Sequence, residues 1–396
     1  MSNLAEVKKI RLAWLATHPI QYQSPLLREI ALVPEIDLTA IFFSNFSTKS
    51  FIDKEFGLSI AWDTSLLDGY KHLYLPGSEE EISEIKTFQP KISGLTKYLN
   101  KKHFDVVLVQ GWNHYGMVLA AWLAKRAGLK VLLRCEATDH VSSSRGLKGW
   151  FRERVIQFLL SQVDFCMAIG TNNRKFYLDR GVPANKIGFM PYCVDNDFFR
   201  LHASSADLDQ LRNSLGLDPS RAVLLYASKF IKRKFPDVLL DAYSQLKEPR
   251  PYLLYVGDGE LANDLKARVR ELGLSDVRFL GFQNQSQLPK YYALADIFVL
   301  TSMNETWGLV VNEAMNAGCA IIVTDSVGSS ADLVRDQING VILLEISNNS
   351  LAEALMRCLD KKRYAEMGIQ SLEIIRTWGI MENILGLNFA LKSLDI

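Results

Sequence analysis

Five cysteines among 396 residues are too few and too scattered for a disulfide framework or a structural zinc site. They are odd in number and never stand in a C-x-x-C spacing: Cys135, Cys166, Cys193, Cys319 and Cys358. Secreted disulfide-rich domains and zinc modules use denser, patterned cysteines. The pattern favours reduced thiols in a cytosolic compartment and excludes a cysteine-based metal centre.

Long apolar runs and an excess of one charge are also missing. No run approaches the ~18 apolar residues of a membrane-spanning helix, and the apolar stretch at 12–16 is shorter than the ~7–15 residues of a signal-peptide core. The formal net charge is +1, whereas nucleic-acid-binding proteins usually carry a basic stripe and a high pI. We expect a cytoplasmic protein, at most peripheral at the inner face of the plasma membrane, with no nucleic-acid partner.

What the chain does have is enough length for two domains and a regular alternation of strands and helices. A single core rarely grows beyond roughly 250–300 residues. Short apolar runs alternate with amphipathic stretches, which is typical of βα units and a parallel sheet. A polar stretch at 195–220 predicts the crossing between domains, so we expect domains at 1–195 and 196–375. The expected strands are 11–16, 37–43, 105–110, 130–135, 164–170 and 186–190 in the first half, and 222–228, 252–257, 277–281, 296–302 and 319–324 in the second.

Glycines, small polar residues and charges follow five consecutive expected strands in the second half. Ligands of open parallel sheets bind beyond the carboxyl ends of the strands, so these positions predict a binding rim. The rim holds Lys229, the glycines of 257–259, Gly281 with Phe282, Glu305, and the segment 327–330.

The segment 301–334 carries the strongest chemical signal. Glu305 lies in a turn between a strand and a helix that begins near Gly308. The first amides of that helix, at Gly308, Leu309 and Val310, would be suited to a diphosphate because they are unpaired and lie at the positive end of the helix dipole. Glu313, one turn further, could accept two ribose hydroxyls. Read alone, however, Glu313 is more simply an acid favoured near a helix start.

Basic residues follow the first strand of the second half. Lys229 and Lys234 flank the turn in "ASKFIKRK" and could neutralise phosphates. The alternative is a solvated charge run, which is the reading we favour for Lys232 and Arg233.

These residues resemble the family-four retaining glycosyltransferases of the GT-B fold over nearly the whole second half. "ETWGLVVNEAM" matches the E-x7-E signature with Glu305 and Glu313, and "ASKFIKRK" stands where the family has G-R-L-x-x-x-K-G. Lys229 takes the arginine position and Lys234 the lysine position, while Ser228 and Phe235 replace glycines. The resemblance implies two Rossmann-like parallel-sheet α/β domains facing across a cleft. It also implies that the final helices, 376–396, cross back to the N-terminal domain.

The resemblance also implies roles. The nucleotide-sugar donor would bind with its diphosphate on the two lysines and the 308–310 amides, its ribose on Glu313, its base near Phe282, and its sugar beside the catalytic Glu305. The family generally needs no metal, no clear DxD motif is present, and the nucleotide sugar is a co-substrate, so we expect no cofactor. The donor-binding set is Ser228, Lys229, Lys234, Gly257, Phe282, Thr306, Trp307, Gly308, Leu309, Val310 and Glu313.

The first half resembles a subgroup of bacterial surface-glycan transferases that open with "THPIQY". His18, Gln21, Asn113 and His114 follow strands, so they are candidates for the acceptor side, although a structural hydrogen bond is at least as good an explanation for each. Glu136 stands near a position where many relatives have histidine. It could act on the acceptor as a second catalytic group, or pair with Arg134 and only fix the loop.

The resemblance implies a retaining transferase that moves a sugar to a glycan, lipid-linked or small-molecule acceptor, in bacterial surface polysaccharide assembly. Two alternatives stay open: a catalytically silent scaffold in a glycan-assembly complex, and a glycoside hydrolase using Glu305 and Glu313. The stretch 142–160 mixes basic and aromatic residues, so it could touch an anionic membrane; an ordinary surface helix is the simpler reading.

Overall fold

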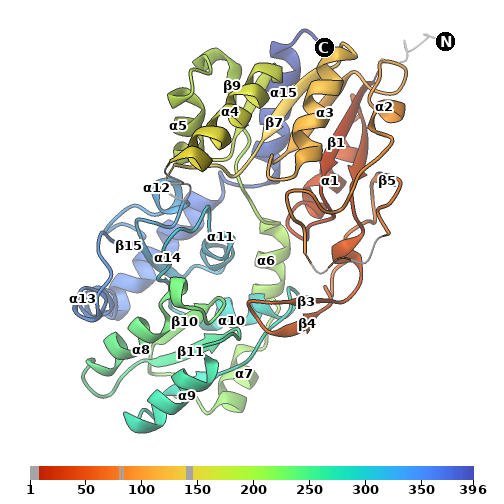
Figure 1. Ribbon diagram of the computed structural model, residues 1–396. Helices are drawn as coiled ribbons and strands as arrows, with labels where there is room; N and C mark the ends of the chain where they lie inside the picture. The colour runs from red at the N-terminus through yellow and green to blue at the C-terminus, as the bar shows by residue number, and fades with distance from the viewer. Residues whose placement is uncertain (1–8, 80–81, 83, 140–145) are drawn as a thin grey trace, which may run out of the picture. The chain divides into compact units, whose positions relative to one another are not determined.

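A computed structural model describes residues 9–79, 82, 84–139 and 146–396, and these divide into two compact units (Figure 1). Unit 1 comprises residues 1–51, 64–191 and 380–396, and unit 2 comprises residues 52–63 and 192–379. The change of unit near 191 lies close to the boundary expected at 195. The return to unit 1 begins at 380 rather than 376.

Unit 1 is built on a seven-stranded parallel sheet in the order β5-β2-β1-β6-β7-β8-β9. Its central strands are mostly apolar and buried because both faces of the sheet are covered. In β1, Ala13 and Leu15 pack on one face while Leu12 and Trp14 pack on the other. The strands are β1 (Ile10–Ala16), β2 (Ile36–Phe42), β5 (Lys71–Tyr74), β6 (Val106–Gln110), β7 (Lys130–Arg134), β8 (Phe165–Ala168) and β9 (Ile187–Phe189).

Helices of unit 1 cover the two faces of this sheet. One face receives α3, α4 and α5, and the other receives α1 and the C-terminal α15. Helix α15 fits because Gly386 lies against the carbonyl of Phe189, where a Cβ atom would collide with that oxygen. The helices are α1 (Ser24–Ala31), α2 (Leu95–Tyr98), α3 (Tyr115–Arg126), α4 (Leu147–Gln162), α5 (Thr171–Asp179) and α15 (Ile380–Ser393), with 3-10 turns η1 (Phe46–Thr48) and η2 (Ala184–Lys186).

Unit 2 contains a six-stranded parallel sheet in the order β12-β11-β10-β13-β14-β15. Its strands are β10 (Val223–Ala227), β11 (Tyr252–Val256), β12 (Val277–Phe279), β13 (Ile297–Leu300), β14 (Ala320–Thr324) and β15 (Gly340–Leu343). Its helices are α6 (Asn196–Ser204), α7 (Leu208–Leu215), η3 (Lys232–Lys234), α8 (Pro236–Ser244), α9 (Ala262–Glu271), α10 (Leu288–Leu294), α11 (Leu309–Asn316), α12 (Ser330–Leu333), α13 (Asn348–Cys358) and α14 (Lys361–Ile375). Both units are therefore Rossmann-like, as the strand and helix pattern predicts.

All eleven expected strands are present, and four others were not expected. Strands β5 and β15 are short edge strands of the two sheets. The remaining two, β3 (Phe51–Asp53) and β4 (Leu58–Ile60), form a separate two-stranded hairpin. Most of this hairpin belongs to unit 2, although its neighbours in sequence belong to unit 1. Each of these strands has only three residues, too few for a period-2 pattern, so the sequence does not reveal this pairing.

The described residues contain no helix long and apolar enough to cross a membrane. All five cysteines are buried and none of them is in a disulfide. Burial raises the pKa of the Cys358 thiol to about 11, so this side chain stays protonated and is part of the apolar core.

Candidate active site

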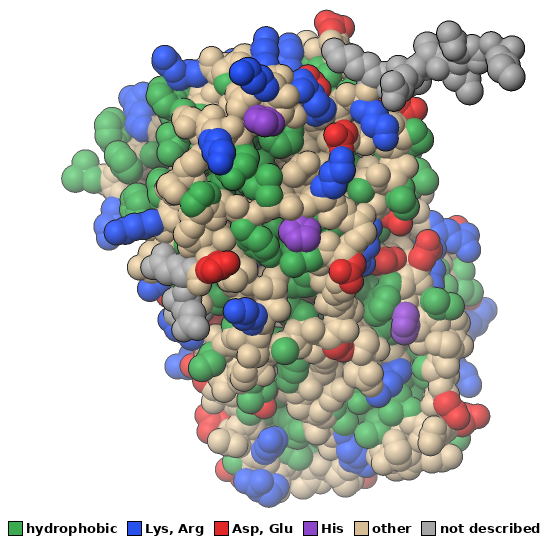
Figure 2. Space-filling model, turned by 90° about the vertical axis from the view of Figure 1, so that its right-hand side faces the viewer, with side chains coloured by type: hydrophobic (Ala, Val, Ile, Leu, Met, Phe, Trp, Pro, Cys, Tyr) green, Lys and Arg blue, Asp and Glu red, His purple; other side chains and the backbone are tan. Residues whose placement is uncertain are grey.

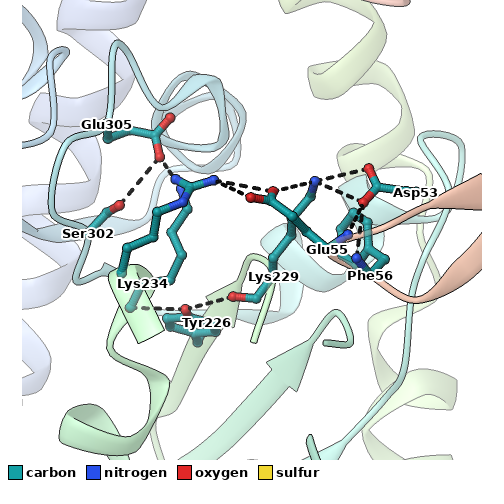
Figure 3. Close-up of polar contacts among 9 residues, drawn as sticks. Asp53, Glu55, Phe56, Tyr226, Lys229, Lys234, Ser302 and Glu305 are labelled. Atoms are coloured by element: carbon teal, nitrogen blue, oxygen red, sulfur yellow. Dashed lines mark hydrogen bonds and ion pairs between the residues drawn. The ribbon is translucent and has the colours of Figure 1, made fainter. Parts of the chain in front are cut away.

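The carboxyl edge of the unit 2 sheet brings the predicted rim together. Ser228 and Lys229 follow β10, Gly257 follows β11, Phe282 follows β12 and Glu305 follows β13. Because these four strands pair in parallel, their ends share one edge of the sheet. Figure 3 shows Lys229, Lys234 and Glu305 in one polar cluster.

The turn that carries Glu305 is held by its backbone. Its amide donates to the carbonyl of Ser326 at 3.3 Å, and its carbonyl accepts from the amide of Gly328 at 2.9 Å. Gly328 must be glycine, because a Cβ atom there would lie 2.0 Å from the carbonyl oxygen of Thr306. The loops after β13 and β14 therefore fix the position of Glu305 from both sides.

The side chain of Glu305 forms an ion pair with Lys234 and accepts a 3.4 Å hydrogen bond from Ser302 Oγ (Figure 3). Both charged side chains are largely buried, with 10% of Lys234 and 18% of Glu305 exposed. Burial lowers the pKa of Lys234, and the carboxylate of Glu305 opposes that shift. In this structure Lys234 is therefore paired with Glu305, and its ammonium group is not open to a phosphate.

Lys229 is held by acids that the sequence did not indicate. Its Nζ lies 2.9 Å from Asp53 Oδ2 and 2.8 Å from Glu55 Oε2, both in the 52–63 hairpin. Arg233, assigned above to a solvated charge run, also reaches Glu55, with Nη2 3.2 Å from Oε1. Three more side chains therefore belong to the site: Asp53, Glu55 and Arg233. No sequence signal pointed to Asp53 and Glu55, because the hairpin lies far away in the chain, whereas Arg233 belongs to the basic run that the sequence shows.

Phe282 lies next to the same hairpin. Its ring meets the ring of Phe56 edge to face, with centroids 5.2 Å apart. Lys229 Nζ lies 4.9 Å from the centroid of Phe56. The hairpin therefore places one aromatic ring beside the residue predicted to lie near the donor base.

Gly308 is the N-cap of α11, and its φ of 87° is a conformation that favours glycine. The amide of Val311 donates to the carbonyl of Gly308 at 2.9 Å, whereas the amides before it precede the hydrogen bonds of the helix. Gly308 and Leu309 are buried and Val310 is half-buried. A phosphate oxygen would reach this turn most readily at Val310.

Glu313 has none of its surface exposed, and its Oε2 accepts a 2.6 Å hydrogen bond from the hydroxyl of Tyr292. A ribose diol could reach this carboxylate only if neighbouring groups moved. The ribose contact stays a prediction, and in the structure Glu313 ties α11 to α10.

Two residues of the expected donor-binding set have packing roles in the structure. Trp307 is buried, donates from Nε1 to Asn312 Oδ1 at 2.9 Å and stacks on Trp378. Its ring is therefore part of the support for α11 and not an exposed donor contact. Gly257 is required for close packing of strand ends, because a Cβ atom would lie 2.0 Å from the carbonyl oxygen of Ser228. Thr306 and Ser228 are half-buried beside these groups.

The acceptor-side candidates of unit 1 follow three neighbouring parallel strands, β1, β6 and β7. Asn113 is exposed, and Gln21 and Glu136 are half-buried. His18 packs edge to face on Phe46 and lies 3.0 Å from Thr17 Oγ1 through Nδ1. Burial lowers the pKa of His18 to about 4, so its imidazole is neutral at pH 7. Arg134, the suggested partner of Glu136, donates to the carbonyl of Pro191 at 3.0 Å and to that of Met190.

His114 has a structural role, which corrects its assignment to the acceptor side. The residue is buried and caps α3: its Nδ1 accepts from the amide of Gly116 at 3.1 Å, and its Nε2 lies 3.0 Å from the carbonyl oxygen of Pro90. Both ring nitrogens are engaged by backbone groups, so no imidazole nitrogen is available to an acceptor.

Within residues 9–79, 82, 84–139 and 146–396, no cluster of three or more His, Cys, Asp or Glu residues is arranged to hold a metal ion.

Comparison with known proteins identifies two family models in the chain. Residues 207–371 match the model described as "Glycosyl transferases group 1", and residues 78–193 match "Glycosyl transferase 4-like domain". The first match spans the candidate site except for the hairpin, and the second spans most of unit 1.

Curated relatives match over less than half of their own length. An uncharacterised glycosyltransferase of Methanocaldococcus jannaschii is 28% identical over 186 residues, which are 46% of this chain and 47% of the relative. D-inositol 3-phosphate glycosyltransferase 2 of Catenulispora acidiphila is 33% identical over 199 residues, 47% of this chain and 45% of the relative.

Solved structures share the fold over almost the whole chain. The HepE protein of Anabaena in complex with UDP has a TM-score of 0.74 at 18% identity, covering 97% of this chain and 100% of that one. Sucrose-phosphate synthase of Thermosynechococcus elongatus has a TM-score of 0.71 at 20% identity, covering 98% and 99%. The fold is therefore that of GT-B glycosyltransferases.

Proposed function

We propose that this protein transfers a sugar from a nucleotide-sugar donor with retention of anomeric configuration. The matched domains and the fold support a family-four glycosyltransferase. The acceptor would be a glycan, a lipid-linked glycan or a small molecule, and the cellular process bacterial surface polysaccharide assembly in the cytoplasm. The observation that carries the proposal is the cluster of Glu305 with three basic side chains at the carboxyl edge of the unit 2 sheet.

Basic groups at this edge suit a leaving group that carries negative charge. As the bond between the anomeric carbon and the diphosphate breaks, charge grows on the phosphate oxygens, and pre-positioned cations stabilise it more than they stabilise the bound donor. A glycoside hydrolase has no such leaving group. The HepE protein was solved with UDP-glucose, which supports a nucleotide-sugar donor for this chain as well.

Glu305 is our candidate for the sugar side of the reaction. A carboxylate held by its backbone and by Lys234 can stabilise positive charge at the anomeric carbon without first reorganising. The acceptor hydroxyl then forms the new bond to that carbon on the leaving-group face, and its proton passes to a basic oxygen. Glu136 of unit 1 is the proposed residue that orients this hydroxyl or takes up the proton.

A donor screen tests the function directly. Thermal melts with UDP-, GDP-, ADP- and dTDP-sugars should identify one nucleotide that raises the melting temperature, since a ligand that binds the folded state stabilises it. Release of the free nucleoside diphosphate, with the anomeric configuration of the product read by NMR, then tests transfer and retention. A protein that binds none of these donors would contradict the proposal. Release of sugar from glycans without any nucleotide would point to a hydrolase.

The role of Glu136 is tested by Glu136→Gln, which preserves size but removes the basic oxygen. Sugar transfer to the acceptor should fall by at least about tenfold while donor binding stays unchanged, as for a group that acts only in proton transfer. Glu35→Gln, the same change at an exposed acid of the same unit, is the control. Normal transfer by a less stable Glu136→Gln protein would make Glu136 structural.

We also propose that α4 contacts an anionic membrane surface. The part of the predicted stretch at 142–145 lies outside the described residues. In α4 itself Leu147, Trp150 and Phe151 are exposed, with Arg154 over the Trp150 ring at 5.2 Å. Unit 1 also carries more Lys and Arg than Asp and Glu, while unit 2 has the reverse excess, and Figure 2 shows many basic side chains on the upper part of one face. Exposed aromatic and basic side chains on one helix suit the headgroup region of a bilayer.

Vesicle sedimentation tests this contact. The protein should bind vesicles that contain anionic lipid and not neutral ones, and the double substitution of Trp150 and Phe151 by serine should weaken binding about tenfold or more. The matched control is replacement of Met381 by serine, an equally exposed apolar residue on α15. Equal binding by both variants would place the contact elsewhere.

A further inference from the structure

The hairpin 52–63 is joined to the basic groups of unit 2 by charge. Asp53 and Glu55 both contact Lys229 Nζ, at 2.9 and 2.8 Å (Figure 3). Glu55 also forms an ion pair with Arg233. Two carboxylates thus present two negative charges and four oxygens to two cations. A diphosphate offers cations the same arrangement of closely spaced anionic oxygens.

The base of the hairpin is anchored separately from its tip. Asn284 Nδ2 donates to the carbonyl of Ala61 at 2.6 Å, and Asp63 accepts from the amide of Ser286 at 3.2 Å. These bonds lie at the far end of the hairpin from Asp53 and Glu55. The tip can therefore leave the basic groups while residues 61–63 stay attached.

We propose that Lys229 and Arg233 form the phosphate grip of the donor site, and that Asp53 and Glu55 occupy this grip until a diphosphate displaces them. The inference deepens the function proposed above and rests on it. It adds Arg233 to the binding residues and assigns Lys234 to the positioning of Glu305 instead.

The strengths of the competing contacts make this exchange possible. Nearly half of the Glu55 side chain is exposed, and so is a similar share of Arg233. Ion pairs that water can reach contribute little to stability, whereas phosphates make shorter, stronger hydrogen bonds to Lys and Arg. Burial acts to raise the pKa of Glu55, but the hydrogen bond and charge of Lys229, aided by Arg233, outweigh it and lower that pKa. Glu55 is thus ionised near neutral pH and able to occupy the grip.

Displacement of the hairpin tip would also move Phe56. Its ring contacts the ring of Phe282 edge to face and lies near Lys229. When the carboxylates leave, Phe56 leaves with them and ends this contact with Phe282, the residue expected beside the base. Phosphate and base sites would therefore open together.

The test is calorimetric titration of the full chain with inorganic pyrophosphate and with UDP, GDP and ADP. The double variant Asp53→Asn and Glu55→Gln keeps the shape but removes both charges, so pyrophosphate should bind at least about threefold more tightly than to wild type. Arg233→Gln should bind it at least about threefold more weakly. Asp264→Asn, an exposed acid on α9, and Lys232→Gln, the exposed neighbour of Arg233, are the matched controls and should leave affinity unchanged.

Hydrogen exchange gives an independent readout. Adding pyrophosphate to the wild-type chain should speed amide exchange in 53–60 and leave 61–63 unchanged, while the double variant should exchange quickly at 53–60 from the start. Slower exchange at 53–60 with pyrophosphate would mean that the hairpin closes on the ligand, which would overturn the proposal.

The outcomes separate this inference from the proposed function. If wild type binds a nucleoside diphosphate but the double variant binds no more tightly, the inference fails and the transferase proposal stands. If the double variant gains affinity but no sugar is transferred, the transferase proposal fails and the occupied grip stands. If no protein binds any diphosphate, both fail.

Discussion

Glu305 shows how a single side chain is prepared for chemistry. Its backbone is held between two loops, and its carboxylate is paired with Lys234, whose own burial makes that charge costly to leave alone. The pair gives Glu305 one orientation before any ligand arrives. In the proposed reaction Lys234 would act on the rate through Glu305, whether or not it contacts a phosphate.

Glu305→Gln should keep the fold and lower kcat at least about 100-fold, the scale for loss of one pre-positioned charge contact. Steady-state kinetics with the identified donor measures this. Glu345→Gln, an exposed acid of the same unit, is the control. Wild-type turnover by Glu305→Gln would remove Glu305 from the mechanism.

His18 should make unit 1 sensitive to acid. Its folded-state pKa of about 4 lies below the ordinary value of 6.5, so the folded protein favours the neutral ring. The stabilisation is present above the ordinary value and is lost as pH falls toward the lowered one. The melting temperature should therefore drop as the pH falls from about 6.5 toward about 4, and His18→Asn should show a smaller drop, because asparagine does not titrate.

Carboxylates titrate in both proteins, so the difference between their slopes of melting temperature against pH reports the imidazole alone. Equal slopes for His18→Asn and wild type would mean that the ring is charged at low cost, and that His18 faces water when the pH falls.

At the scale of elements, glycines at the strand ends decide whether the site can form. At Gly257 and at Gly328, an added Cβ atom would lie 2.0 Å from a backbone carbonyl oxygen, which is too close for any other residue. The loops after β11 and β14 can approach their neighbours only because these positions lack a Cβ atom. Gly257 and Gly328 thus contribute to the site by letting these loops pack closely.

Gly328→Ala should separate the loop after β14 from the Glu305 turn, because the added methyl group would lie 2.0 Å from the carbonyl oxygen of Thr306. We expect a melting temperature lower by several degrees and a loss of activity larger than the loss of folded protein explains, measured by melts and kinetics together. Gly216→Ala, at φ 63° with open space around it, should cost only about 1 kcal/mol of backbone strain. Similar losses for both variants would show that close packing at Gly328 is unimportant.

At the scale of the whole molecule, the two units carry different parts of the proposed reaction. The donor residues belong to unit 2 and the acceptor-side candidates to unit 1, and each set follows the carboxyl ends of a parallel sheet. A nucleotide that binds in the absence of the acceptor should therefore change hydrogen exchange in unit 2 alone.

The identified nucleoside diphosphate should slow hydrogen exchange at 229–234 and 305–313 of unit 2 and leave the unit 1 segments 18–21 and 113–136 unchanged. The physical reason is that bound phosphate suppresses local opening only where it makes contacts. Peptide-level exchange measured with and without nucleotide checks this. Slower exchange in unit 1 alone would mean that the donor binds to unit 1, which would contradict our proposal.

The sequence by itself determined the strand and helix order, the two Rossmann-like units and the position of Glu305, Lys229 and Lys234 at strand ends, because hydrophobic period and turn chemistry are local properties. Tertiary structure decided what those residues meet. Asp53 contacts Lys229 across 176 positions of chain, and no local pattern encodes such a pairing. Burial likewise turned His114 into a helix cap, Trp307 into a packing residue and Glu313 into a partner of Tyr292. Burial depends on what all other segments pack against a side chain, so only the folded chain determines it.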